Sequence, residues 1–218
     1  MNPSHMTALK TISCGRGREV RTCIQERYIN EVWAKKAAAV VNDWLWVGRG
    51  NDELDIAMSL GLSWVCVDSE RSYNECKRTD PTKDTPNGCH SSTEKAIHEY
   101  AETVKENACG NCEEFSIVAF DFLRRSGVKN IELMLRDFIH PMRCCWPLEP
   151  LAGESNHAFV VLGRAPESMV ESAMTWGFSA FICDPWKPKE PRAYPASELD
   201  KYWGRDVKRT RVIYPNPA

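Results

Sequence analysis

The spacing of apolar residues predicts helices in the first half of the chain and mostly strands in the second. Apolar side chains recur near the 3.6-residue period of a helix over residues 20–47. A short helix capped by Asn51 or Asp52 is expected next, then a strand at residues 63–67 and a polar loop at residues 68–92. Loops of this length in compact domains are often functional.

Two amphipathic helices follow, one over residues 94–108 and one that begins near Cys112 and ends at Gly127. Later apolar runs predict strands at residues 131–135, 157–162, 178–183 and 207–214. Because helices precede strands, we expect an α+β fold with a mainly antiparallel sheet. We expect one compact domain, in which a helical extension of residues 1–90 packs on a core of residues 91–218.

Charge and hydropathy exclude several classes of partner. The net charge of -2 over 218 residues gives no basic footprint, so nucleic acid is not expected as a partner. No apolar run approaches the roughly 18 residues of a membrane span. No apolar stretch follows the first basic residues, so a conventional signal peptide is not expected. The chain is therefore expected to be cytoplasmic, or secreted without such a signal into a host cytosol.

Ten cysteines are many for a chain that is long enough to bury a hydrophobic core without disulfide bonds. Their spacing is irregular, and Cys144 and Cys145 are adjacent, which does not suggest an ordered disulfide framework. Mostly reduced thiols are therefore expected, as in a cytosol-like compartment.

Candidate chemistry begins with Cys112, which follows Gly110 and Asn111 at a helix start. Backbone N–H groups and the helix dipole at such a position stabilise a thiolate, the nucleophilic form of cysteine. Glu113 and Glu114 oppose this effect unless they point away or pair with basic residues. A buried structural cysteine is the alternative interpretation.

A thiol nucleophile needs a base, and the base needs a group that orients its ring. His157 opens the most apolar strand and is preferred over His140, which lies in a proline-rich connection, because rigid elements hold catalytic groups better than loops. Asp184 ends the next strand before Pro185 and can accept a hydrogen bond from the second ring nitrogen of His157. A core-edge histidine and a strand-ending turn are the structural alternatives.

Three motifs in this order resemble the transglutaminase-like branch of the papain-like cysteine enzymes. Gly-Asn-Cys-Glu-Glu at residues 110–114 opens a helix, and Asn-His-Ala-Phe at residues 156–159 opens a strand. Cys-Asp-Pro-Trp at residues 183–186 closes the next strand. Each motif is short, but their order on matching elements is more specific than any one of them. The likeness covers roughly residues 91–190.

The resemblance implies a nucleophile helix packed on an antiparallel sheet. It makes Cys112 the nucleophile, His157 the base and Asp184 the orienting acid. The oxyanion hole is expected to use the backbone N–H of Cys112, with Asn107 or Asn111 as candidate side-chain donors. Neither a cofactor nor a metal is expected.

Members of this group hydrolyse proteins, cross-link glutamine to amines or deamidate glutamine, and bacterial effectors that modify host proteins recur among the small ones. The expected activity is therefore that of a thiol-dependent amide hydrolase or acyl transferase that forms a thioester. The expected partner is a protein substrate, and a host protein if the chain is an effector. The sequence does not choose between water and an amine as the final acceptor.

Three alternatives stay open. Cys109 and Cys112 have the spacing of a thioredoxin-like redox pair, although the preceding stretch is predicted as a helix and not as the strand that such a pair follows. The same two residues with Cys144, Cys145 or Cys183 would supply four zinc ligands, although no second evenly spaced pair exists. Eight tryptophans also suit a non-catalytic interaction module, or simply a core.

Overall fold

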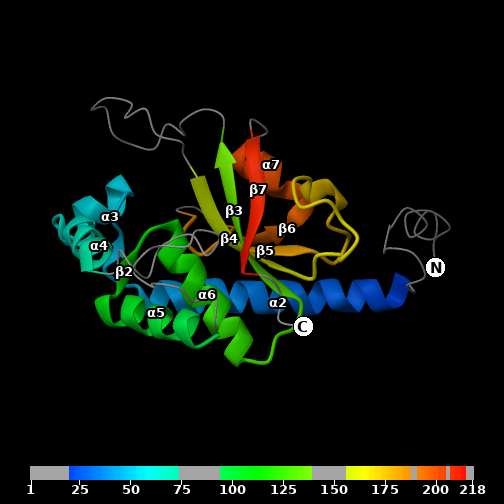
Figure 1. Ribbon diagram of the computed structural model, residues 1–218, viewed down its shortest axis with the longest axis horizontal. Helices are drawn as coiled ribbons and strands as arrows, with labels where there is room; N and C mark the ends of the chain where they lie inside the picture. Colours follow the sequence, from blue (N-terminus) through cyan, green and yellow to red (C-terminus); the bar gives the residue numbers. More distant parts are fainter. Residues whose placement is uncertain (1–19, 74–93, 139–155, 188–190, 205–206, 215–218) are drawn as a thin grey trace, which may run out of the picture.

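The computed structural model describes residues 20–73, 94–138, 156–187, 191–204 and 207–214. Most of the two predicted long connections lies outside these ranges, as do His140, Cys144 and Cys145. Within the described ranges the protein combines helices with an antiparallel sheet (Figure 1).

The central sheet has five strands in the order β6-β5-β4-β3-β7, and all neighbouring strands are antiparallel. These are β3 (Ile131–Phe138), β4 (Asn156–Leu162), β5 (Phe181–Cys183), β6 (Ala193–Pro195) and β7 (Val207–Tyr214). A separate parallel pair joins β1 (Gly48–Arg49) to β2 (Cys109–Gly110). The prediction of a mainly antiparallel sheet is confirmed, but β1, β2 and β6 are too short to show a strand period in the sequence.

The helices precede and flank the sheet. They are α2 (Val20–Trp44), α3 (Glu53–Met58), α4 (Leu62–Tyr73), α5 (Glu94–Asn107), α6 (Cys112–Arg125) and α7 (Leu199–Trp203). Two single turns, η2 (Ala173–Thr175) and η3 (Ala196–Glu198), lie between the later strands. Among the described helices, none has the length and apolar character needed to cross a membrane.

The strand predicted at residues 63–67 is wrong, because α4 covers these residues. Ser63 and Val67 are buried while Trp64 and Val65 are exposed, which is the i, i+4 spacing of one helix face. The run of four apolar residues at 64–67 does not distinguish a strand from a buried helix segment. Packing of α4 against β1 and β2 decides in favour of the helix.

Two apolar layers cover the two faces of the sheet. On one face α2, α5 and α6 form a common core with strand residues such as Leu133, Val160 and Phe181. On the other face Phe159 and Trp176 belong to a second cluster, which includes residues of η3 and α7. Figure 1 shows α2 crossing the lower part of the molecule, with α3 and α4 near one of its ends. The N-terminal helix thus shares its core with the sheet.

Candidate active site

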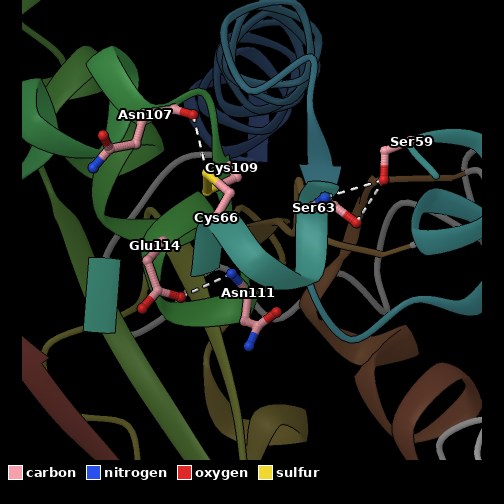
Figure 2. Close-up of a disulfide and its surroundings, with 7 residues drawn as sticks. All are labelled: Ser59, Ser63, Cys66, Asn107, Cys109, Asn111 and Glu114. Atoms are coloured by element: carbon pink, nitrogen blue, oxygen red, sulfur yellow. Dashed lines mark hydrogen bonds between the residues drawn. A yellow bond between two sulfur atoms is a disulfide. The ribbon is translucent and has the colours of Figure 1, made fainter. Parts of the chain in front are cut away.

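Cys112 is the first residue of α6, and the turn before it is fixed by backbone and side-chain contacts. Asn111 is the N-cap, and its backbone N–H donates a hydrogen bond of 2.8 Å to Oε2 of Glu114 (Figure 2). The Tyr100 hydroxyl donates to Oε1 of the same carboxylate at 3.3 Å. Glu114 is therefore turned into the protein and holds the first turn of α6 in place. Cys112 itself is half-buried and carries a free thiol.

Gly110 allows this turn to close tightly. A Cβ atom added at Gly110 would lie 2.4 Å from Cβ of Glu114, which is too close for any other residue. The neighbouring β2 backbone is held by its parallel pairing with β1. The glycine before the cysteine therefore has a packing reason that the sequence motif alone does not reveal.

A disulfide joins Cys66 of α4 to Cys109 of β2, three residues before Cys112 (Figure 2). Cys23 is also disulfide-bonded. The prediction of mostly reduced thiols is thus wrong for three of the five described cysteines, and Cys112 and Cys183 are the free ones among them. The spacing of cysteines in the sequence did not reveal the Cys66–Cys109 pair, because the two residues are 43 positions apart and only folding brings them together. While bonded to Cys66, Cys109 supplies neither a redox partner for Cys112 nor a zinc ligand.

Removing this disulfide by the paired change Cys66→Ala and Cys109→Ala is expected to lower the free energy of unfolding by about 4 kcal/mol. The bond spans 43 residues, and a cross-link of that span restricts the unfolded chain. Urea unfolding without reductant measures the difference. Each single variant should lose nearly as much, because each breaks the same bond. A loss below about 1 kcal/mol for the pair would contradict this expectation.

His157 lies near the start of β4 and is fixed against α6. The Ser116 hydroxyl of α6 donates a hydrogen bond of 2.9 Å to the carbonyl of Ala158, the next residue of β4. Asp184 directly follows Cys183, which pairs with Val160. The antiparallel register therefore brings Asp184 to the strand that carries His157.

The imidazole of His157 and the carboxylate of Asp184 form a buried pair. Nε2 of His157 lies 2.9 Å from Oδ2 of Asp184, and both side chains are at most 1% exposed. The same oxygen accepts hydrogen bonds from the Tyr194 hydroxyl at 3.1 Å and from the Trp203 indole N–H at 2.9 Å. Three donors thus hold one carboxylate oxygen, which orients the His157 ring.

The Cys112 thiol interacts with the other side of the His157 ring. Burial by itself lowers the pKa of His157, but the charge and hydrogen bond of Asp184, with a further contribution from the Cys112 sulfur, raise it to about 9. Asp184 occupies Nε2, so Nδ1 is the nitrogen left for the thiol proton. Nδ1 is buried and has no fully formed hydrogen bond within the described part of the chain. Such contacts are often loose before substrate binds.

Three of the predicted site residues therefore meet in space, and two aromatic residues that the sequence did not single out join them. The Trp203 ring stacks on His157 with 3.8 Å between centroids, whereas Trp186 of the Asp-Pro-Trp motif lies 5.5 Å away and tilted. Tyr194 supplies a hydroxyl to Asp184, and burial raises its pKa well above the ordinary value. No local motif marks Trp203, because it reaches the site from α7.

The two candidate oxyanion donors occupy different environments. Asn107 is exposed at the end of α5, and in Figure 2 its side chain points away from Asn111. Asn111 is 7% exposed and directly precedes Cys112. Of the two, Asn111 therefore has the better position for a donor beside the Cys112 backbone N–H.

A second histidine cluster lies away from this site. Ligand atoms of His98, Glu102 and Asp121 lie within 4.8 Å of one another. However, Nη1 of Arg125 lies 3.1 Å from Nε2 of His98, and a guanidinium only donates, so that nitrogen accepts. The ring proton is then on Nδ1, which lies 3.0 Å from Asp121 Oδ2 and donates to it. This tautomer offers no free nitrogen to a metal, and we assign none here.

A cavity of about 920 Å³ lies beside the segment that leads to Cys112. Its described lining comes from the end of α2, from β1, α3 and α4, and from Phe115 of α6. Neither Cys112 nor His157 belongs to that lining. The cavity touches the site through β1, because Gly48 and Arg49 pair with Cys109 and Gly110.

Comparison of the chain with protein-family models, curated proteins and solved structures finds no match. The likeness to transglutaminase-like enzymes therefore stays a prediction that rests on three motifs. Independently of it, the fold brings Cys112, His157 and Asp184 together at the junction of α6 and the sheet.

Proposed function

We propose that this protein is a thiol-dependent amide hydrolase or acyl transferase of the papain-like, transglutaminase-like kind. Cys112 would be the nucleophile, His157 the general base and acid, and Asp184 the residue that orients His157. The observation that carries the proposal is the buried Asp184–His157 pair, whose imidazole also interacts with the free thiol of Cys112. A structural histidine does not need a buried carboxylate on one side and a half-exposed thiol on the other.

Because the pKa of His157 is about 9, the imidazole is already protonated at neutral pH, and the reaction begins from an ion pair in which Nδ1 holds the proton that the Cys112 thiol has given up. The sulfur then attacks the carbonyl carbon of an amide, and its oxygen becomes an oxyanion held by the Cys112 N–H and the Asn111 side chain. The amide C–N bond breaks, and His157 gives its proton to the departing amine or ammonia. Water, or a second amine, attacks the remaining thioester while His157 takes the proton, and the thiol of Cys112 is restored.

A protein substrate fits the surroundings better than a small molecule does. The cavity beside the site is lined partly by large apolar side chains that are more than half exposed: Trp46, Met58, Leu60, Leu62 and Val65. Isolated exposed apolar residues are ordinary, but a cluster of this size is typical of a surface that contacts another chain. We place apolar side chains of the substrate protein here. The same surface would serve the alternative of a non-catalytic interaction module.

The disulfides bear on where the protein acts. Disulfides persist in oxidising compartments and are rare in the cytosol. With Cys23, Cys66 and Cys109 bonded, we favour a protein that is exported over one that stays in the cytoplasm. Export as an effector that acts on a host protein is compatible with this, and remains part of the proposal.

Selective alkylation tests the activated thiol without knowledge of a substrate. At pH 6, iodoacetamide is expected to modify Cys112 at least about 10-fold faster than Cys183, because burial and the charge of Asp184 raise the pKa of the Cys183 thiol. In a His157→Gln variant the rate at Cys112 should fall about 10-fold, since the base is gone. Mass mapping of the modified peptides gives both rates. Equal slow modification of both residues would reject the proposed nucleophile.

Mass measurement of candidate target proteins then separates the reaction types. Incubation with the wild type, and with Cys112→Ala as the control, gives a gain of about one dalton for deamidation. Fragments mean proteolysis, and joined species mean cross-linking. Binding of a target by both proteins with no change in its mass would favour the interaction module.

A further inference from the structure

The face of the His157 ring is covered by a tryptophan that no sequence motif marks. The rings of His157 and Trp203 are nearly parallel, with an interplanar angle of 25° and centroids 3.8 Å apart. The Trp203 indole N–H donates to Oδ2 of Asp184 at 2.9 Å and also lies 3.0 Å from the Tyr194 hydroxyl. One side chain thus contacts both the base and the acid of the candidate triad.

The short helix that carries Trp203 is tied to the strand next to His157. Nη2 of Arg136 donates a hydrogen bond of 2.6 Å to Asp200, in the first turn of α7, and lies 3.4 Å from the carbonyl of Gly204. Trp203 lies between these two anchors. Arg136 of β3 is itself the register partner of His157 on β4. The two contacts of Arg136 therefore fix Trp203 relative to β4, the strand that carries His157.

We propose that Trp203 is a positioning residue of the candidate active site. Its ring holds the protonated His157 ring by cation–π stacking, and its indole N–H fixes Oδ2 of Asp184, the oxygen that pairs with His157. This inference rests on the proposed function, and it adds a residue that acts through His157 and Asp184. A π-face over a desolvated cation stabilises the charged form by an amount comparable with a weak ion pair. Trp203 would thus help to keep the imidazole protonated after it has taken the thiol proton.

Other charged and titratable groups lie beside His157 or its partner Asp184. They are Asp184 after β5, Cys112 of α6, Tyr194 of β6 and Arg136 of β3. All of them remain when Trp203 is replaced, so a change in the titration of His157 reports on the tryptophan. Leucine keeps the site apolar but removes both the π-face and the N–H, whereas phenylalanine keeps a smaller π-face.

The test is the NMR titration of His157 in the full chain labelled at histidine, with the signal assigned by His157→Gln. Trp203→Leu is expected to lower the titration midpoint of His157 by about one pH unit, and Trp203→Phe by about half as much. Tyr202→Phe, next to Trp203 on the same helix, should leave the midpoint unchanged.

A merely structural tryptophan would lower the melting temperature and leave the midpoint in place. A folded Trp203→Leu whose midpoint stays within about 0.2 pH unit of the wild type would overturn the inference. If the leucine variant does not fold, the same criterion applied to Trp203→Phe decides. Failure of the proposed function would appear separately, as unselective alkylation of Cys112 in the wild type, while the histidine titration can still be measured.

Discussion

Cys112→Ala is expected to lower turnover of the target protein by at least about 10⁴-fold while the protein remains folded. The sulfur is the atom that forms the thioester, and no other described cysteine can replace it, because Cys183 is fully buried and the remaining described cysteines are disulfide-bonded. His157→Gln should lose a similar factor. The double variant should be no worse than either single variant, since the two residues act as a unit.

Cys183→Ala is the matched control for this experiment. It also removes a free thiol and lies next to Asp184 in the sequence, but its sulfur is fully buried in the core that the sheet shares with α2. It should keep turnover within about two-fold of the wild type and lose only a modest part of the free energy of unfolding. Turnover in Cys112→Ala above about a tenth of the wild-type value would remove Cys112 from the mechanism.

Asp184→Asn is expected to move the pKa of His157 from about 9 to below its ordinary 6.5. Burial lowers this pKa and remains in the variant, while the charge that raises it is lost. At pH 7 the imidazole would then be largely neutral, and turnover should fall by about 10²- to 10⁴-fold. Histidine-labelled NMR gives the pKa, and turnover on the same target gives the rate.

The same substitution makes stability depend differently on pH. A pKa of about 9 in the folded state, against 6.5 in the unfolded chain, stabilises the wild type by about 3 kcal/mol at pH 6.5 and below. That contribution is lost as the pH rises through about 9. The difference in unfolding free energy between wild type and Asp184→Asn should therefore shrink from pH 6 to pH 10.

Asp137→Asn controls for the loss of a carboxylate from the same sheet. Asp137 follows Arg136, the register partner of His157, so its side chain lies on the opposite face of β3, where it is 3.9 Å from Arg211. Its amide variant should leave the His157 titration where it is. If Asp184→Asn also leaves it unchanged, the buried pair does not set the state of His157, and the assignment of Asp184 is wrong.

Secondary structure was predicted most reliably from the sequence where the periodic pattern of apolar residues is long. The helix over residues 94–107 and the one that begins at Cys112 were predicted nearly to the residue, because their apolar faces repeat over three turns or more. The segment at residues 63–67 was misassigned because a run of only four apolar residues fits either period. The three-residue strand β6, which carries Tyr194, is too short to show any period.

The sequence by itself determined the long helices, the longer strands of the central sheet and three candidate site residues, since helix starts, helix-ending glycines and apolar runs are local patterns. Only the tertiary structure decided which groups surround those side chains. Trp203, Tyr194 and the Cys66–Cys109 bond reach the site from other elements of the fold. Contacts between distant segments depend on how the helices and the sheet pack as a whole, and a local pattern carries no record of that packing.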